Sequence, residues 1–201
     1  MAKYPEYPVY WLPGNFRLKI MAKFYTQLTD DLKGFIQRQQ IFFVGTAAYD
    51  GRVNVSPKGM DTLRVVTDGR IAWLNLTGSS NETAAHLREN DRITLMFCAF
   101  ESDPLILRLY GHARVFHPHD AEWGSLLPFF PAIPGARQII DISVDLIQTS
   151  CGFGVPFFEF KAERDQLEKW AEKKGPEGIR QYWQEKNQVS LDGKPTGIMA
   201  E

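Results

Sequence analysis

Residues 41–59, IFFVGTAAYDGRVNVSPKG, and residues 62–76, TLRVVTDGRIAWLNL, decide the fold. Both stretches are rich in β-branched and aromatic residues, and each is divided by an Asp-Gly dipeptide, Asp50-Gly51 in the first and Asp68-Gly69 in the second. Asp-Gly fits the two positive-φ positions of a type I′ turn, so each stretch predicts a β-hairpin. Because the second hairpin follows the first at once, we expect four antiparallel strands in a meander.

The remainder of the chain adds more strands and a few helices. Thr29 precedes two acids and an apolar face, which is typical of a helix start. Helices are predicted over residues 29–40, 80–89 and 117–130, and strands over 92–100, 105–117 and 137–150. Gly111 is expected to kink or bulge the long strand that contains it. Six or seven antiparallel strands without βαβ alternation indicate a mainly β protein, a closed or partly closed barrel with surface helices.

The two ends of the chain differ from this central part. Pro5, Pro8 and Pro13 exclude a regular helix over most of residues 1–20, and a second Met-Ala-Lys begins at Met21. We expect residues 1–20 to be an extension, either upstream of the true start or an arm that wraps a partner subunit. Residues 21–160 are then the barrel domain. Residues 161–201 are a charged helical tail, divided by a Gly-Pro stop and start, that packs on the barrel or across a dimer contact.

Composition limits the partners and the location of the protein. The 201 residues are 44% hydrophobic, enough for one globular core, and the formal net charge of -1 gives no reason to expect nucleic acid or an anionic membrane as partner. No apolar run is long enough to span a membrane and no signal peptide is present, so we expect a cytoplasmic protein. Cys98 and Cys151 are too few for a disulfide framework. We interpret Cys151 as a packing residue, with a reactive thiol as the alternative.

Residues 73–90, WLNLTGSSNETAAHLREN, are the stretch most suggestive of chemistry. An apolar strand runs through a polar, Gly-containing loop into a helix, and Ser79 and Glu82 have the spacing of a capping box. Free N–H groups and the positive end of a helix dipole bind anions, and hydroxyls at Thr77, Ser79, Ser80 and Thr83 could add hydrogen bonds to a phosphate. A well-capped helix without a ligand explains this segment about equally well. Lys58, with Arg64 and Arg88 as further cations, favours the anion site.

The order of these segments resembles a known family. FFVGTAAYDGRVNVSPKG, a strand ending in NLTG, SNETAAHLREN, RITLMF and LRLYGHARV follow one another as in the FMN-binding split β-barrels related to pyridoxamine 5'-phosphate oxidase, over about residues 35–155. The charged tail and SCGFGVP are similar to one branch of about this length. The resemblance implies an antiparallel split barrel of the FMN-binding type, a homodimer, and FMN in a cleft between the subunits.

The resemblance also implies where FMN lies. The flavin ring would lie near Asn54, Val55, Ser56 and Lys58 and be flanked by Trp73, Leu74, Asn75 and Leu76, while Thr77, Ser79, Ser80, Asn81 and Thr83 would approach the phosphate. The partner subunit would contribute from Arg108 and residues 97–100. Pyridoxamine 5'-phosphate oxidases end in an arginine-rich segment for the substrate phosphate, whereas this chain ends SLDGKPTGIMAE. We therefore do not expect pyridoxamine phosphate to be the substrate.

Three functions follow from this resemblance. The first is an FMN oxidoreductase that takes hydride from NAD(P)H or another small molecule and passes electrons to a small acceptor. The second is a flavin or haem carrier without turnover, for which His112, His117 or His119 would be the axial ligand. The third, a deazaflavin protein, would need a larger basic groove than the sequence indicates. His117-x-His119 is a weak metal signal by itself, and we assign no metal ligand.

Overall fold

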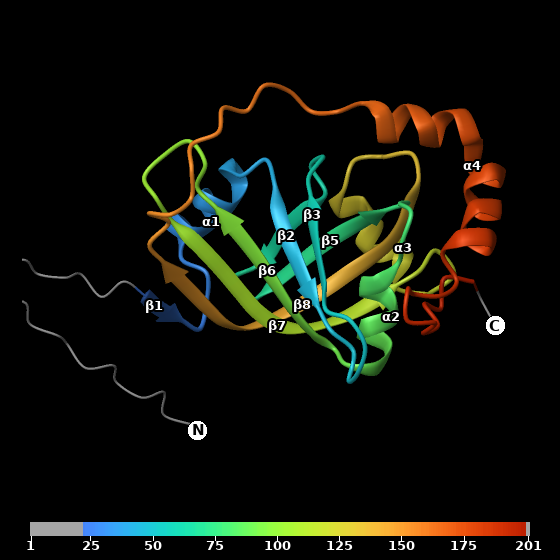
Figure 1. The fold of residues 1–201 in the computed structure, drawn as a ribbon, viewed down its shortest axis with the longest axis horizontal. Helices are drawn as coiled ribbons and strands as arrows, with labels where there is room; N and C mark the ends of the chain where they lie inside the picture. Colours follow the sequence, from blue (N-terminus) through green and yellow to red (C-terminus); the bar gives the residue numbers. More distant parts are fainter. Residues whose placement is uncertain (1–21, 200–201) are drawn as a thin grey trace, which may run out of the picture.

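The computed structural model describes residues 22–199, in which a strongly curved antiparallel sheet is flanked by helices (Figure 1). The strands are β1 Ala22–Tyr25, β2 Phe42–Thr46, β3 Asn54–Lys58, β4 Leu63–Thr67, β5 Arg70–Leu76, β6 Arg92–Cys98, β7 Ile106–Phe116 and β8 Ala136–Ser150. The helices are α1 Asp30–Arg38, α2 Glu82–Glu89, α3 Trp123–Leu126 and α4 Gln166–Lys186, with a 3-10 turn η1 at Leu127–Phe129. The predicted mainly β class is confirmed. Eight strands replace the expected six or seven because β1 pairs with the far end of β8.

Both predicted hairpins are present, but they do not form one meander. The strand order is β3-β2-β6-β7-β8-β5-β4, so β3 and β4 lie at opposite ends of the sheet and do not pair. The prediction of four consecutive paired strands is therefore wrong. β5 is buried along most of its length and pairs with β8 on its second edge, which satisfies the backbone groups that burial removes from water. The chain crosses from β3 to β4 through Met60 and Asp61, which both have a left-handed φ, 65° and 53°.

The hairpin turns also differ from the prediction. Seven residues separate β2 from β3, and of the Asp-Gly pair there only Gly51 has a positive φ, 88°. Asp68 and Gly69 do form a two-residue connection, yet neither has a positive φ, and the pairing shifts between Val65 and Thr67. The prediction of a type I′ turn is therefore wrong at both sites. At the first turn the loop is instead held by residues near the chain end, because the Arg52 backbone N–H donates to the Asp192 carboxylate over 2.7 Å.

The core fills the inside of the curved sheet. It contains the apolar face of α1, with Leu32 and Phe35, and buried side chains of the central strands such as Trp73 and Phe97. Thr29 caps α1 as expected, accepting the Leu32 N–H over 3.4 Å. The pairing of β7 with β8 shifts next to Gly111, which confirms the expected bulge. A Cβ atom at Gly111 would lie only 2.1 Å from the Ser143 carbonyl oxygen, so glycine is required there.

The segment after β8 runs across the open end of the barrel before α4 begins (Figure 1). The Phe158 N–H donates to the Phe100 carbonyl over 3.0 Å, which ties this segment to the β6–β7 loop. Helix α4 begins at Gln166 rather than at residue 161, and Gly175, with φ 64°, breaks it ahead of Pro176 as the sequence predicts. Residues 187–199 return to the barrel and bury Ile198.

Two further expectations are tested by the structure. The helix predicted over residues 117–130 is limited to α3 and η1, because residues 117–120 form a turn in which the Asp120 carboxylate accepts the His117 N–H over 2.7 Å. Among residues 22–199 no helix is both long enough and apolar enough to cross a membrane. The extension expected at residues 1–20 lies outside the described residues.

Candidate functional site

A cavity of about 890 Å³ opens between the end of β3, the middle of β5 and the segment that precedes α4. Six residues predicted from the sequence line it: Lys58, Trp73, Leu74, Asn75, Leu76 and Thr77. Three phenylalanines, Phe100, Phe158 and Phe160, also line it, and so do the charged residues Arg38, Arg164, Glu101, Glu159 and Glu163. Its volume lies within the range of about 300–1,000 Å³ that small-molecule and cofactor pockets occupy.

Lys58 brings a positive charge to this cavity. It is the last residue of β3, and its Nζ lies 5.1 Å from the centre of the Trp73 ring. Trp73 is itself fixed by an edge-to-face contact with Phe42 in the core. Within residues 22–199 no carboxylate forms an ion pair with Lys58. Burial, with a smaller contribution from the positive charge of Arg137, lowers the pKa of Lys58 to about 8.

Arg137, at the start of β8, is a second cation close enough to affect Lys58, but it is 3% exposed and does not line the cavity itself. Its Nη1 donates to the Ser80 carbonyl over 3.0 Å and to the Asn187 side-chain oxygen over 2.9 Å. Its Nε is buried with no hydrogen-bond partner in the part of the chain that the structure describes. Burial lowers the pKa of Arg137 to about 10. Among residues 22–199 this buried guanidinium hydrogen-bonds only neutral groups, and with the half-buried Lys58 it places two positive charges close together beside the cavity.

The loop between β5 and α2 lies against Arg137 through the Ser80 carbonyl. It does not form the capping box that the sequence predicted. Helix α2 begins at Glu82 with Asn81 as N-cap and has no side-chain cap. Ser79 therefore does not cap the helix, and the Glu82 carboxylate instead accepts the Leu191 N–H over 2.9 Å. Both Ser79 and Ser80 are exposed and open to a ligand or to another chain. The start of α2 is left with backbone N–H groups that no side chain satisfies, as an anion site requires.

The end of α4 holds this loop in place. The Trp183 Nε1 donates to the Thr77 hydroxyl over 2.8 Å, and that hydroxyl donates to the Gly135 carbonyl over 2.8 Å. Thr77 is therefore committed to the protein and has no proton left to give a phosphate. Asn187 donates to the Gly78 carbonyl over 3.1 Å, and its own carbonyl accepts from the Asn81 side chain over 3.2 Å.

The remaining predicted residues lie outside the cavity. Asn54, at the far end of β3, donates to the Thr83 hydroxyl over 3.3 Å, so these two come together beside the start of α2. Ser56 is half-buried between them and Lys58, whereas Val55 points to the other side of the edge strand and is 66% exposed. Arg108, on β7, bonds the Ser150 hydroxyl over 3.1 Å and does not line the cavity.

Sequence reasoning missed Arg137, Asn187 and Trp183. A polar pair, Arg137-Gln138, at the start of an otherwise apolar strand was a signal for Arg137, because a buried charge needs a reason. No local pattern connects Asn187 and Trp183 to a loop more than one hundred residues earlier.

Comparison with known proteins decides the family. Residues 28–151 match the family described as pyridoxamine 5'-phosphate oxidase. The chain belongs to the pyridoxamine 5'-phosphate oxidase family. It is also 36% identical, over 193 residues, to the pyridoxamine 5'-phosphate oxidase family protein ustO of Aspergillus flavus, an alignment that covers 87% of this chain and 78% of the relative.

Solved structures similar to this family member are more distant. HupZ of Group A Streptococcus is 20% identical with a TM-score of 0.48, over 59% of this chain and 91% of its own. A putative pyridoxamine 5'-phosphate oxidase of Lactobacillus delbrueckii is 17% identical with a TM-score of 0.48, over 61% and 94%. An FAD-binding protein of Mesorhizobium loti is 11% identical with a TM-score of 0.43, over 66% and 99%. The split-barrel class predicted from the sequence agrees with the family.

Proposed function

We propose that the protein binds FMN at the cavity of Lys58 and Trp73 and acts as an FMN-dependent oxidoreductase on a small molecule. One observation carries the proposal: two cations, Lys58 and Arg137, are withdrawn from water beside the cavity with no carboxylate bonded to either among residues 22–199. Such charges are costly unless an anion compensates them. A phosphate-bearing cofactor would supply that anion, and membership of the family supports a flavin.

The arrangement of the cavity fits FMN part by part. Arg137, Ser80 and the uncapped start of α2 would hold the phosphate. The phenylalanines that line the cavity would pack against the ring system, while Trp73, which is buried in the core, would support Lys58 at the base of the cavity. Bound FMN would supply hydride and electron transfer, with NAD(P)H as a candidate donor. Lys58 would keep a positive charge beside the ring and so stabilise negative charge gained on reduction.

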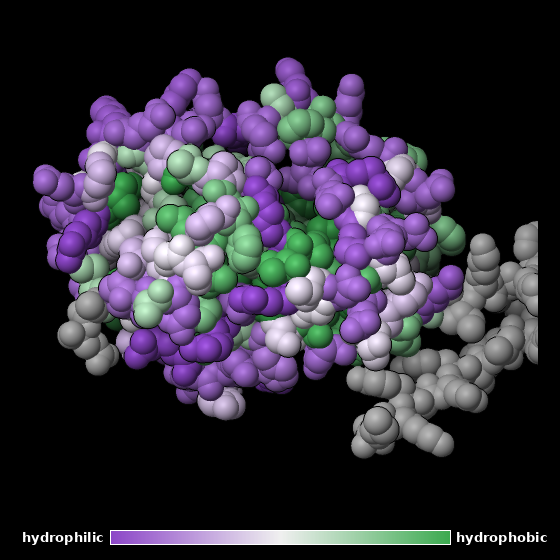
Figure 2. All heavy atoms as spheres, turned by 180° about the vertical axis from the view of Figure 1, so that it is seen from behind, coloured by the Kyte–Doolittle hydropathy of each residue, from purple (hydrophilic) through white to green (hydrophobic). Residues whose placement is uncertain are grey.

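We further propose that the chain works as a homodimer with the cofactor at the subunit interface. Large apolar side chains are exposed on edge strand β3, the loop before it and the segment before α4: Tyr49, Val53, Val55, Phe153, Phe157 and Phe158. On the face seen from behind the view of Figure 1, apolar side chains are also open at the surface in the middle, within a hydrophilic surround (Figure 2). Exposed apolar groups of this kind mark association surfaces. We expect Val55→Glu to convert a dimer to a monomer in light scattering, and an unchanged dimer would contradict the placement.

The tail argues against pyridoxamine phosphate as substrate. Residues 187–199 lie against α2 and the β2–β3 loop, where Lys194 pairs with Glu89 over 2.8 Å, and none of them lines the cavity. Residues 187–199 therefore bring no arginine to the site, whereas Arg164, in the segment before α4, does line the cavity.

The experiment is an FMN titration of the apoprotein with a matched pair of variants. Lys58→Met should weaken FMN binding about 10- to 100-fold, because a charge-assisted contact contributes about 1.5–3 kcal/mol. Lys174→Met is the control, since Lys174 also lies over a tryptophan ring, 5.4 Å from the centre of Trp170, but outside the cavity. Equal affinities for both variants, or no FMN binding by the native protein, would overturn the proposal.

A further inference from the structure

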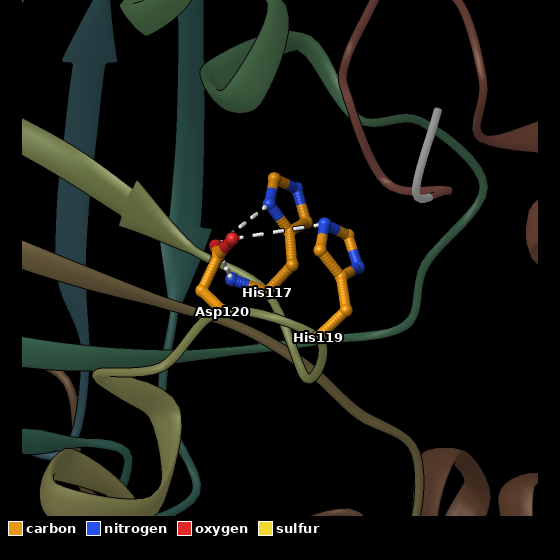
Figure 3. A group of neighbouring side chains, drawn as sticks. All are labelled: His117, His119 and Asp120. Atoms are coloured by element: carbon orange, nitrogen blue, oxygen red, sulfur yellow. Dashed lines mark hydrogen bonds and ion pairs between the residues drawn. The ribbon is translucent and has the colours of Figure 1, made fainter.

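The turn after β7 gathers two imidazoles and a carboxylate in one place (Figure 3). His117, His119 and Asp120 each present a ligand atom, and these atoms all lie within 4.8 Å of one another. The His117 Nδ1 is 3.5 Å from one Asp120 oxygen, and the His119 Nε2 is 3.7 Å from the other. None of the three lines the cavity described above. In a regular helix His117 and His119 would point in nearly opposite directions, so the turn is what brings them together.

His117 is already oriented for a metal. It is 6% exposed, and its second ring nitrogen, Nε2, lies 3.2 Å from the side-chain nitrogen of the fully buried Gln138. Protein ligands to metals typically have the second imidazole nitrogen fixed by a polar partner. The Gln138 oxygen accepts from the Asn75 side chain over 3.0 Å, so turning both amides by 180° would keep that bond reversed and place the Gln138 oxygen where it accepts an Nε2 proton, which leaves Nδ1 free to bind.

Asp120 and His119 complete the group and leave it open to solvent. The Asp120 carboxylate is positioned by the His117 N–H over 2.7 Å, and its side chain is 33% exposed. The His119 ring lies parallel to that of His117, with 5.2 Å between ring centres, and its side chain is 37% exposed. Ligand atoms around tetrahedral zinc lie about 3.3 Å apart. The two histidine–carboxylate separations, 3.5 and 3.7 Å, are already close to that spacing.

We propose that His117, His119 and Asp120 bind a divalent transition metal ion, Zn²⁺ in the first instance, through two imidazole nitrogens and one carboxylate oxygen. Two nitrogens and one oxygen suit zinc and its first-row neighbours rather than magnesium or calcium. With three protein ligands, at least one coordination position is left for water. The alternative is an acid-capped turn that needs no metal, because Asp120 already stabilises the turn by accepting the His117 N–H.

The test is calorimetric titration of ZnCl₂ into the full-length, tag-free chain after chelator treatment. We expect saturable uptake of about one Zn²⁺ per chain in the micromolar range or below, weakened at least about tenfold by His119→Ala. His112→Ala is the control, because it also removes an exposed histidine bonded to an aspartate, Asp91, over 2.8 Å, but outside the group. A melting curve for each variant shows that the fold is retained.

A second variant removes the charge but keeps the shape. Asp120→Asn retains an oxygen that can accept the His117 N–H, so the turn survives, whereas the anionic ligand is lost. We expect it to weaken Zn²⁺ binding as His119→Ala does. The proposal is overturned if the native chain takes up no Zn²⁺, if both variants bind as the native chain does, or if His112→Ala weakens binding equally.

Discussion

Lys58 and Lys194 show two ways in which one residue type is used in this fold. Lys194, near the chain end, pairs with Asp50 and Glu89, and hydrogen bonds to those carboxylates raise its pKa. Lys58, at the cavity, has an aromatic ring and a second cation nearby, and burial lowers its pKa to about 8. Lys194 is thus neutralised by the chain itself and joins distant segments. Lys58 has no carboxylate partner among residues 22–199, which is what a site for an anionic ligand requires.

The largest effect on FMN binding is expected for Arg137, the second buried cation beside Lys58. Arg137→Leu should weaken FMN binding about 100-fold, since a charged hydrogen bond and a compensated buried charge are lost together. Riboflavin, which lacks the phosphate, should bind native chain and variant within about threefold of each other. Parallel fluorescence titrations with FMN and riboflavin measure this ratio. An equal loss for both ligands would show that Arg137 supports the cavity instead of the phosphate.

Asn187→Ala tests the support of the phosphate loop. The side chain is fully buried and bonds both Arg137 and the Gly78 carbonyl. Leaving two buried groups without a partner should lower the free energy of unfolding by about 2–3 kcal/mol, measured by denaturant titration. Asn90→Ala, which removes a bond to the Ala47 carbonyl at the other end of α2, should cost less. An Asn187→Ala variant as stable as native protein would contradict the role given to this residue.

FMN affinity should depend on pH through Lys58. Because its pKa is lowered to about 8, Lys58 loses its proton in the apoprotein as pH rises through 8, and the bound anionic cofactor, whose ring would lie beside Lys58, favours the protonated form. Affinity should therefore fall up to about tenfold between pH 7 and pH 9. Lys58→Met, already weaker, should show a flat profile over that window. A native profile equally flat would mean that Lys58 does not face the ligand.

The smallest effect on the site is expected for Lys194. Lys194→Met removes the contacts to Asp50 and Glu89 but leaves the cavity untouched, so the melting temperature should fall while FMN affinity stays within about twofold. Lys33→Met is the control. It breaks an ion pair with Asp68, which does not involve the tail. A large loss of FMN binding in Lys194→Met would show that the ion pairs of Lys194 also shape the cavity, against the separate roles given to Lys194 and Lys58.

The local sequence pattern predicted which strands and helices form better than it predicted which strands pair with each other. The hairpins of β2–β3 and β4–β5, the Thr29 cap and the Gly111 bulge follow from residues close in sequence. The separation of β3 from β4 does not, because it depends on β8, whose pairing with β5 is a long-range choice. For the same reason only six of the fourteen predicted cofactor residues line the cavity, and Arg137 was missed. Arg137 matters to the site because its side chain is buried. The burial of a charged residue cannot be predicted from a single sequence.

The visible absorption spectrum of freshly purified protein, followed by acid release and chromatography of any chromophore, tests the central claim most directly. The account predicts the bands of an oxidised flavin and release of about one FMN per chain. A colourless protein that also refuses added FMN, or a protein with the Soret band of haem in place of flavin bands, would contradict it.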